Sequence, residues 1–273
     1  MAPNRESSGG PARDDPHVTY LTSRVDDQAE RADDQRERAD QRERATKLVE
    51  AATSRGVTLR VTGGLAVAMR CASASHPALT RRYKDLDLVG SGRQRGDIDS
   101  FLKTSGLKAN EEFNSLHGKH QMLYSDDEDR VIDVFIDRIV MCHSLDLAGR
   151  LNIHPVTLSP NDLLLTKLQV LQTNESDLKD AVAILVDFEV DADRVIGVLA
   201  GDWGWWRTAT EVLGKVKEYA ASLPDFGDTK VVADRISALE RRIEAAPKGM
   251  RWRARARVGD RVRWYQTPEE EDY

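Results

Sequence analysis

Two aspartates separated by one residue interrupt an apolar run in the segment "YKDLDLV" at residues 83–89. If this run is a β-strand, Asp85 and Asp87 project from the same side, because side chains alternate along a strand. Two neighbouring carboxylates repel each other, so either one takes up a proton or a cation neutralises the pair. Mg²⁺ and Mn²⁺ prefer such oxygen ligands. The pair therefore predicts a metal site.

A third acid lies in a similar context further along the chain. Asp133 is bracketed by apolar residues in "RVIDVFID", and Asp137 competes with it for the same role. Three acids on adjacent strands suit a two-metal site that stabilises the attacking and departing oxygens of a phosphoryl transfer. Isolated Asp-x-Asp pairs also occur as solvated turns. For Asp133, the alternative to a metal-binding role is an ion pair with a nearby arginine.

A double glycine precedes these acids in "VTGGLAVAMR" at residues 61–70. Gly63 and Gly64 sit between an expected strand and an expected helix. Backbone N–H groups without a Cβ in the way can approach phosphate oxygens at a helix N-terminus. A tight turn is the alternative reading of two glycines. Together with the acids, however, the glycines predict a site that uses a nucleoside triphosphate.

The elements that position these residues form a mixed α/β (α+β) arrangement. The periodicity predicts strands at residues 57–61, 84–90, 119–125 and 130–140, with helices at 63–73 and 97–106. This small mixed-sheet domain is expected over residues 45–150. From Ser159 and Pro160 the pattern becomes helical, with a capping serine followed by a proline at the first helical position. A helical domain is therefore predicted over residues 151–246.

The two ends of the chain differ from this middle part. Residues 1–22 are rich in Pro, Gly, Ser and charge and are predicted to be disordered. Residues 23–44 predict a polar, charged helix, for which a coiled coil is disfavoured because the apolar seam is thin. Residues 247–273 alternate arginine with apolar residues and then become acidic. This alternation predicts a basic β-hairpin and an acidic tail.

Composition limits the classes of function. The 273-residue chain has a net charge of −6, so any affinity for nucleic acid must come from a local patch. Cys71 and Cys142 form no metal-ligand pattern and are expected to be reduced thiols of a cytoplasmic protein. No run is long and apolar enough to span a membrane, and the N-terminus lacks the apolar core of a signal peptide.

The segments "VTGGLAVAMR", "RRYKDLDLV" and "RVIDVFID", in this order, resemble the nucleotidyltransferase fold of the DNA polymerase β superfamily. The likeness is closest to a group that includes the abortive-infection type IV toxins and related bacterial toxin nucleotidyltransferases. It continues through the helical segment and covers about residues 45–265. It implies an enzyme that uses Mg²⁺ or Mn²⁺ and moves a nucleoside monophosphate from an NTP to an acceptor hydroxyl.

The resemblance also implies individual roles. The residues concerned are Gly63 and Gly64 as phosphate-binding, Asp85, Asp87 and Asp133 as metal-binding and catalytic, Lys167 as a triphosphate contact, and Asp180 as a catalytic or orienting acid. Asp177 is the alternative to Asp180, and a snorkelling surface lysine is the alternative for Lys167. The cations Arg70, Arg81, Arg82 and Lys84 lie near the motifs. Arg82 and Lys84 are predicted to bind the nucleotide, with solvated loop cations as the alternative.

The acceptor is left open by the sequence. The toxin resemblance implies RNA, in particular tRNA, and the C-terminal arginines and tryptophans favour RNA as well. A small molecule such as an aminoglycoside is the alternative acceptor. A non-catalytic NTP-binding or regulatory protein of the same fold is the alternative from another class, and an antitoxin or regulatory protein is a candidate partner.

Overall fold

The computed structural model describes the backbone of residues 16–267 and the side chains of residues 34–267. The chain divides into two compact units, residues 1–41 and residues 42–273. Helix α1 (Pro16–Ser54) contributes to both units. Residues 1–15 of the segment predicted to be disordered lie outside the described residues. Residues 16–22 belong to α1, because Pro16 is tolerated in the first turn of a helix and the polar residues that follow permit helix.

A five-stranded mixed sheet forms the centre of the second unit, with the strand order β1-β2-β5-β4-β3. Its strands are β1 (Leu59–Val61), β2 (Leu86–Gly90), β3 (Lys108–Ala109), β4 (Gln121–Ser125) and β5 (Val131–Ile136). The central pair β2 and β5 is parallel, whereas the other pairs are antiparallel. The mixed α/β class predicted from the sequence is confirmed.

The predicted strand 130–140 is divided in the structure. Asp137 has a φ of 58°, and this left-handed residue ends β5. The chain then forms a two-stranded sheet of β6 (Arg138–Val140) and β7 (Ser144–Asp146). The predicted pairing of residues 119–125 with this run is confirmed by the antiparallel register of β4 and β5.

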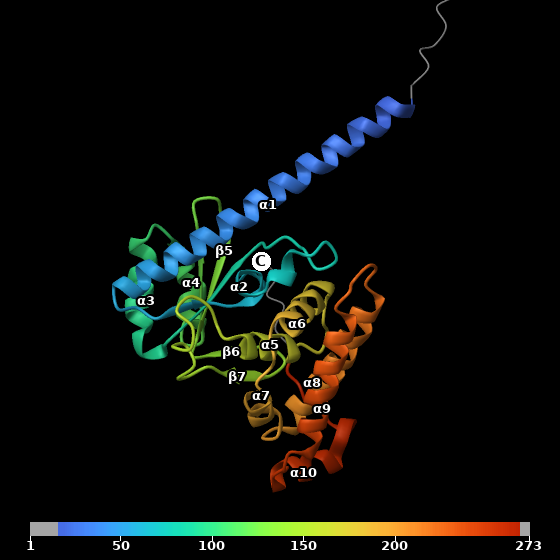
Figure 1. Ribbon diagram of the computed structural model, residues 1–273. Coiled ribbons are helices and arrows are strands. Elements are labelled where there is room, and N and C mark those ends of the chain that lie inside the picture. Colours follow the sequence, from blue (N-terminus) through green and yellow to red (C-terminus); the bar gives the residue numbers. More distant parts are fainter. Residues whose placement is uncertain (1–15, 268–273) are drawn as a thin grey trace, which may run out of the picture. The chain divides into compact units, whose positions relative to one another are not determined.

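Helices cover both faces of the sheet. They are α2 (Gly63–Arg70), α3 (Arg95–Thr104), α4 (Glu111–His117), α5 (Pro160–Leu168) and α6 (Glu175–Asp187), with short 3₁₀ turns at Ala72–Ser75 and Gly92–Gln94. Figure 1 shows α3 on one face and α2, α5 and α6 on the other, while α4 lies beside β4. The first helix also contributes, since Ala45, Val49 and Ala52 of α1 are buried. This agrees with the amphipathic pattern expected from residue 45.

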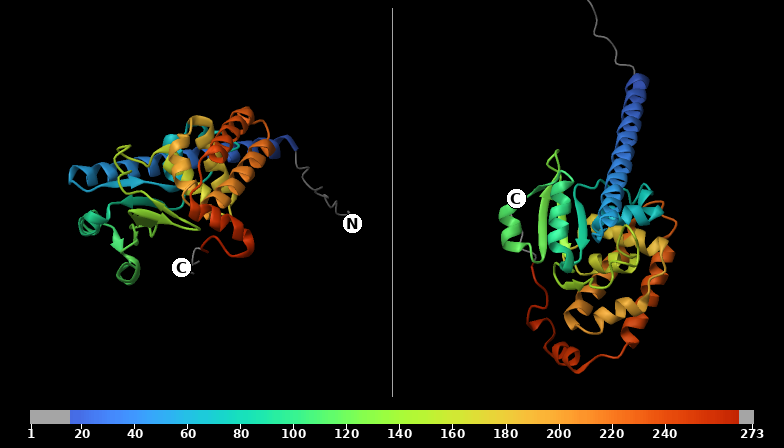
Figure 2. Two further views of the ribbon diagram at one scale, coloured as in Figure 1. Left: turned by 90° about the horizontal axis from the view of Figure 1, so that it is seen from below. Right: turned by 90° about the vertical axis from the view of Figure 1, so that its left-hand side faces the viewer.

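A second group of helices follows in sequence. It contains α7 (Ala192–Leu199), α8 (Trp203–Ser222), α9 (Thr229–Ala245) and α10 (Met250–Val258), with a 3₁₀ turn at Gly259–Arg261. In Figure 2, right, these orange and red helices gather below the sheet-bearing part. Among the residues from 16 to 267, no helix is long and apolar enough to cross a membrane.

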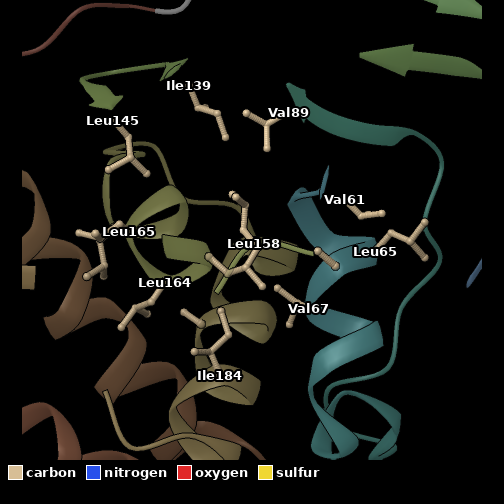
Figure 3. Close-up of a cluster of buried hydrophobic side chains, with 14 of the residues drawn as sticks. Val61, Leu65, Val67, Val89, Ile139, Leu145, Leu158, Leu164, Leu165 and Ile184 are labelled. Atoms are coloured by element: carbon tan, nitrogen blue, oxygen red, sulfur yellow. The ribbon is translucent and has the colours of Figure 1, made fainter. Parts of the chain in front are cut away.

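The predicted border between a catalytic domain ending at residue 150 and a helical domain does not separate compact units. Apolar side chains from β1, α2, β2, the β6–β7 hairpin, α5 and α6 meet in one cluster (Figure 3). Val61, Val67, Leu145, Leu164 and Ile184 are each at most 1 % exposed within it. Burial of this size on both sides of residue 150 joins the sheet and the helices, because apolar area removed from water stabilises their contact.

The prediction of a basic β-hairpin at the C-terminus is wrong, because this stretch forms helix α10. Its alternating arginines suggested a strand, but arginine, alanine and methionine are strong helix formers and need no strand partner. Gly249 stands at the N-cap, and Gly259, with a φ of 60°, ends the helix. The acidic tail predicted after it lies outside the described residues from residue 268 onward.

Candidate active site

The structure brings the three predicted acids to one side of the sheet. Asp87 in β2 and Asp133 in β5 are direct partners in the parallel register. Neighbouring strands lie about 4.8 Å apart, so the two carboxylates project side by side. Asp85 precedes β2 by one residue and lies on the same side as Asp87, since it is two residues away. Asp137 instead accepts a hydrogen bond from the backbone N–H of Gly92 at 2.9 Å.

Repulsion among these acids is visible in their protonation. Burial and the charge of Asp133 raise the pKa of Asp87 to about 6, with a smaller contribution from Asp85 and opposition from Lys167. Burial also raises the pKa of Asp133, against the effect of a hydrogen bond that Gln121 Nε2 donates to Asp133 Oδ1 at 2.7 Å. The cluster is therefore electrostatically unfavourable as long as no cation compensates it.

The residues present fit a hard divalent cation by their chemistry. Each of the three acids offers carboxylate oxygens, and burial together with the charge of Asp133 raises the pKa of Asp87. Among the described residues, no three His, Cys, Asp or Glu side chains are arranged in ready metal-ligand geometry. The three carboxylates share one side of the sheet without forming a finished coordination shell.

The glycine turn is tied directly to the acid-bearing strand. The backbone N–H of Thr62 donates to the carbonyl of Asp87 at 2.8 Å, just where β1 passes into α2. Gly63 has a φ of +63°, and a Cβ at this position would lie 1.9 Å from Asp87 Oδ2. Any side chain at this position would therefore be unfavourable for two reasons: the left-handed backbone conformation and the collision with the Asp87 carboxylate. The sequence alone did not reveal that the glycine makes room for the acid.

The second glycine makes room for an arginine. A Cβ on Gly64 would lie 1.6 Å from Arg81 Nη2 and 3.1 Å from Asp180 Oδ2. The Arg81 guanidinium thus rests against the start of α2, where the first backbone N–H groups have no partner inside the helix. The Thr62 hydroxyl lies at the same place, is buried, and has no hydrogen-bond partner among the described residues.

Beyond the glycines, two cations and two acids form a closed ion cluster. Arg81 donates to both carboxylate oxygens of Asp180, at 3.1 and 2.8 Å. Lys167 lies 2.8 Å from Asp180 and 3.0 Å from Asp177. Burial by itself would lower the pKa of Lys167, but these carboxylates raise it, so its ammonium stays charged. Lys167 is 9 % exposed, which excludes the snorkelling surface position.

These residues surround a cavity of about 540 Å³. Its walls include Thr62, Gly63, Gly64, Asp85, Asp87 and Lys167. Arg82 and Lys84, predicted to bind the nucleotide, also line it but are exposed at its rim. Asp133 and Asp180 stand just behind the lining, each in contact with a residue of it. A volume of this order suits one small ligand such as a nucleotide.

Sequence reasoning gave too little weight to three residues. Arg81 was one of four nearby cations, of which Arg82 and Lys84 were predicted to bind the nucleotide instead. The structure places Arg81 at the glycine turn through its contact with Asp180. Gln121 has no local signal in the sequence, since it reaches Asp133 only through strand pairing. Thr62 adjoins the glycines, and its position directly before "GG" is the one signal that pointed to it.

Replacement of Gly63 by alanine tests the turn. We expect Gly63→Ala to lose at least about 2 kcal/mol of stability, because a left-handed φ and a collision with Asp87 combine. Chemical denaturation measures this change. Gly96→Ala is the matched control: nothing lies within 4 Å of its added Cβ, and this helical position should gain about 0.5 kcal/mol. Equal stability of the two variants would contradict the assignment of the turn.

Comparisons with known proteins gave matches only among solved structures. No protein-family model and no curated protein matches the chain. A solution structure of the antibiotic-resistance factor ANT(2'')-Ia is 16 % identical, with a TM-score of 0.36 over 76 % of this chain and 95 % of that chain.

Two further structures give comparable values. The crystal structure of ANT(2")-Ia with adenylyl-2"-tobramycin is 18 % identical, with a TM-score of 0.34 over 74 % of this chain and 98 % of that chain. An antigenic nucleotidyltransferase-like protein from Paracoccidioides brasiliensis is 15 % identical, with a TM-score of 0.35 over 76 % and 94 %. Since TM-scores at this level carry no argument, the function has to follow from the geometry of the site itself.

Proposed function

We propose that this chain is a nucleotidyltransferase that moves a nucleoside monophosphate from an NTP to an acceptor hydroxyl. The observation that carries the proposal is the register of Asp87 with Asp133, directly beside the turn at Gly63. Adjacent, partly buried carboxylates are costly to maintain, so their presence next to the cavity favours chemistry over packing.

The triphosphate would bind at the start of α2. Backbone N–H groups at Gly63 and Gly64, together with the unpartnered Thr62 hydroxyl, are suitable donors to phosphate oxygens. Lys167 and Arg81 also line the cavity and add positive charge, with Arg81 directly beside Gly64. Their present carboxylate partners keep both cations in place before the nucleotide arrives, which lowers the cost of ordering them on binding.

Asp85, Asp87 and Asp133 would hold Mg²⁺ or Mn²⁺. When bound, such an ion would neutralise the negative charge of the carboxylates and of the phosphate oxygens. Asp87 would gain from this neutralisation, because burial and the adjacent charge of Asp133 raise its pKa and so disfavour its ionised form.

In the transfer step, the acceptor oxygen forms a bond to the α-phosphorus as the bond from this phosphorus to the bridging oxygen of the β-phosphate breaks. Pyrophosphate leaves, and the acceptor proton passes to a carboxylate oxygen of Asp133. The raised pKa of Asp133 suits a base, and Gln121 fixes its orientation by holding Oδ1. Lys167 and Arg81 face the charge that develops on the pyrophosphate.

A labelling assay tests the proposal. Purified protein, Mg²⁺ and each of the four α-labelled NTPs are incubated with total RNA or with small polyhydroxylated amines such as aminoglycosides. Transfer of label to either acceptor, with release of pyrophosphate, is the expected result. Absence of both label transfer and pyrophosphate release with all four nucleotides would exclude the function for these acceptors.

The closed ion cluster favours a second candidate, an NTP-binding protein without turnover. Arg81 pairs with Asp180, and Lys167 pairs with both Asp177 and Asp180, so this part of the site is stable without a substrate. Calorimetry separates the two functions. Binding of NTP without pyrophosphate release in the presence of RNA and aminoglycosides identifies the binder, whereas release identifies the enzyme.

Arg81 and its neighbour Arg82 differ in position, since Arg81 lies beside Gly64 and Arg82 is exposed. We expect Arg81→Ala to weaken NTP binding at least about tenfold, because a cation next to a phosphate contributes roughly 1.5 kcal/mol or more. Arg82→Ala removes the same charge from an exposed rim position and should weaken binding less than about threefold. Titration calorimetry with each NTP measures both variants. A stronger effect of Arg82→Ala would show that the sequence-based choice of Arg82 was right.

A further inference from the structure

The C-terminal segment, residues 249–267, encloses a second cavity against the beginning of α8. This cavity measures about 710 Å³. Its walls include Trp203, Trp252, Trp264, Tyr265, Arg251 and Arg263. It is distinct from the candidate active site, with which it shares no lining residue.

The aromatic walls are held rigidly. Trp264 Nε1 donates to the hydroxyl of Thr208 on α8 at 3.1 Å, and the ring of Trp264 meets that of Trp203 edge-on with centroids 6.0 Å apart. On the other side, Trp252 of α10 packs edge-on against Trp206 at 5.3 Å. Part of each ring still borders the cavity, because Trp252 and Trp264 are only half-buried. Fixed aromatic faces of this kind lose little entropy when a planar group stacks on them.

The arginines of the segment have no acidic partners. This holds, in the part of the chain that the structure describes, for Arg251, Arg253, Arg255, Arg257, Arg261 and Arg263. Two acids lie close to the segment in the described part of the chain. Asp260 pairs with Arg207 of α8, and Asp202, which lines the cavity, accepts hydrogen bonds from the N–H groups of Gly204 and Trp205. In a chain with a net charge of −6, such a concentration of uncompensated positive charge is a local anion-binding surface.

Packing alone does not account for this arrangement. The tryptophans anchor the segment to α8, but arginines that served only solubility or stability would be expected to pair with the many acids of the chain. Arg255 shows a structural role, since it donates to the carbonyls of Gly259 and Val262 and stacks over Trp203 at 4.6 Å. Arg251 and Arg263 line the cavity with fewer bonds: Arg263 donates to the exposed hydroxyl of Thr267 at 3.4 Å and lies over the ring of Tyr265 at 5.6 Å, and Arg251 has no side-chain bond within the described chain.

We propose that this cavity binds single-stranded nucleic acid, with a base stacked against Trp264 or Tyr265 and the flanking phosphates on Arg251 and Arg263. Aromatic faces next to unpaired arginines match the alternation of base and phosphate in an unpaired strand. A duplex offers no exposed base face, and an acidic peptide would use the arginines but not the stacking surface. The chemistry therefore favours an unpaired strand over both.

The two cavities are neighbours along the β6–β7 hairpin. Met141 borders the candidate active site, whereas Cys142 and His143, the next two residues, border the aromatic cavity. A strand held in the aromatic cavity would thus lie next to the site of transfer. The role of this strand as the acceptor rests on the proposed function, whereas its binding does not.

Binding is tested first, without catalysis. A fluorescein-labelled, unstructured RNA of 12 nucleotides is titrated with the full chain in EDTA, and anisotropy reports the Kd. The pocket variant Arg251→Gln/Arg263→Gln removes two lining arginines. Its control, Arg253→Gln/Arg257→Gln, removes the same charge from α10 at positions outside the lining. The pocket variant should weaken binding at least about tenfold, and the control less than about threefold.

Salt dependence and stacking supply two further readouts. The slope of log K against log salt should fall by about 1.4 in the pocket variant, because each phosphate contact to a single strand contributes about 0.7. Tyr265→Leu, which keeps the apolar contact but removes the stacking face, should weaken binding about tenfold with an unchanged slope. Tyr265→Leu removes the edge-on contact of Tyr265 with Trp264 and its contact with Arg263 at 5.6 Å, but it keeps both partners of the hydrogen bond from Trp264 to Thr208.

Several results would overturn the proposal. These are no binding at 50 mM salt, equal losses in the pocket variant and its control, or equal affinity for a duplex of the same sequence. Displacement of the RNA by poly-glutamate at an equal concentration of charges would identify an acidic protein as the ligand instead. RNA binding that persists while no nucleotide is transferred would leave this inference standing and count only against the proposed function.

Discussion

Asp87→Asn is expected to reduce nucleotidyl transfer at least about 10³-fold while making the metal-free protein more stable. The loss of activity follows from the removal of one of three carboxylates that converge beside the glycine turn. The gain in stability follows from the same geometry. Burial and the adjacent charge of Asp133 disfavour the ionised form of Asp87, and asparagine keeps the shape of the side chain without the charge.

The pH dependence of this gain has a definite sign. The pKa of Asp87 rises from 3.8 to about 6 on folding. The folded protein therefore holds the proton more tightly than the unfolded chain, and wild-type stability falls as pH rises between about 4 and 6. The difference between Asp87→Asn and the wild type should be near zero at pH 4 and reach about 2 kcal/mol above pH 7.

Urea denaturation in EDTA at a series of pH values measures this difference. Mg²⁺ should stabilise the wild type and leave Asp87→Asn unchanged, because binding to the folded state alone raises stability. Asp85→Asn is the control: Asp85 is exposed, so this variant should lose activity without a comparable gain in stability. An Asp87→Asn protein less stable than the wild type at pH 8 without metal would show that the carboxylate is compensated within the chain.

The largest loss of stability is expected for Asp162→Ala. Asp162 is fully buried at the start of α5, where it accepts a hydrogen bond of 2.6 Å from Ser159. Arg150, from the loop after β7, donates to both of its oxygens, and Arg194 of α7 donates to Oδ1 at 2.9 Å. The acid thus joins three parts of the chain, and its removal leaves two arginines without their counter-charge. Such a loss costs about 3–5 kcal/mol.

Guanidinium denaturation of Asp162→Ala measures this cost. Asp193→Ala is the matched control, because Asp193 pairs with Arg242 at 2.7 Å but its side chain is 83 % exposed. An exposed pair contributes at most about 1 kcal/mol. Similar midpoints for the two variants would mean that the arginines of the Asp162 cluster find other partners.

The strands and helices that carry the site were predictable because their signals are local. Alternation around Asp87 and Asp133 identified both strands, and the direct pairing of the two residues supports their common location. The capping serine and proline at residues 159–160 identified the start of α5, where Ser159 Oγ accepts from the N–H of Asp162. These signals depend on neighbouring residues, so no knowledge of the fold was needed.

Other features depend on contacts between distant residues. Arg81 could not be distinguished from Arg82 in the sequence, since only the meeting of residues 81 and 180 selects it. The arginine-rich C-terminal segment has a period of two that fits a strand. In the structure it forms a helix, whose Trp252 packs on Trp206 of α8, and the residues after this helix are held by the hydrogen bond from Trp264 to Thr208 of α8. The border expected at residue 150 failed because one apolar core extends across it.

Local sequence signals identify the residue types that the site can use: three acids in strand context, two glycines before a helix, and a lysine among leucines. Their spacing is fixed by the chain, and side-chain direction follows from local backbone geometry. Only the tertiary structure decided which of them meet, where Asp87 lies against Gly63, and which arginines find no acid. The physical reason is that electrostatics and burial act through space, so charges far apart in the sequence set each other's energies once the core has brought them together.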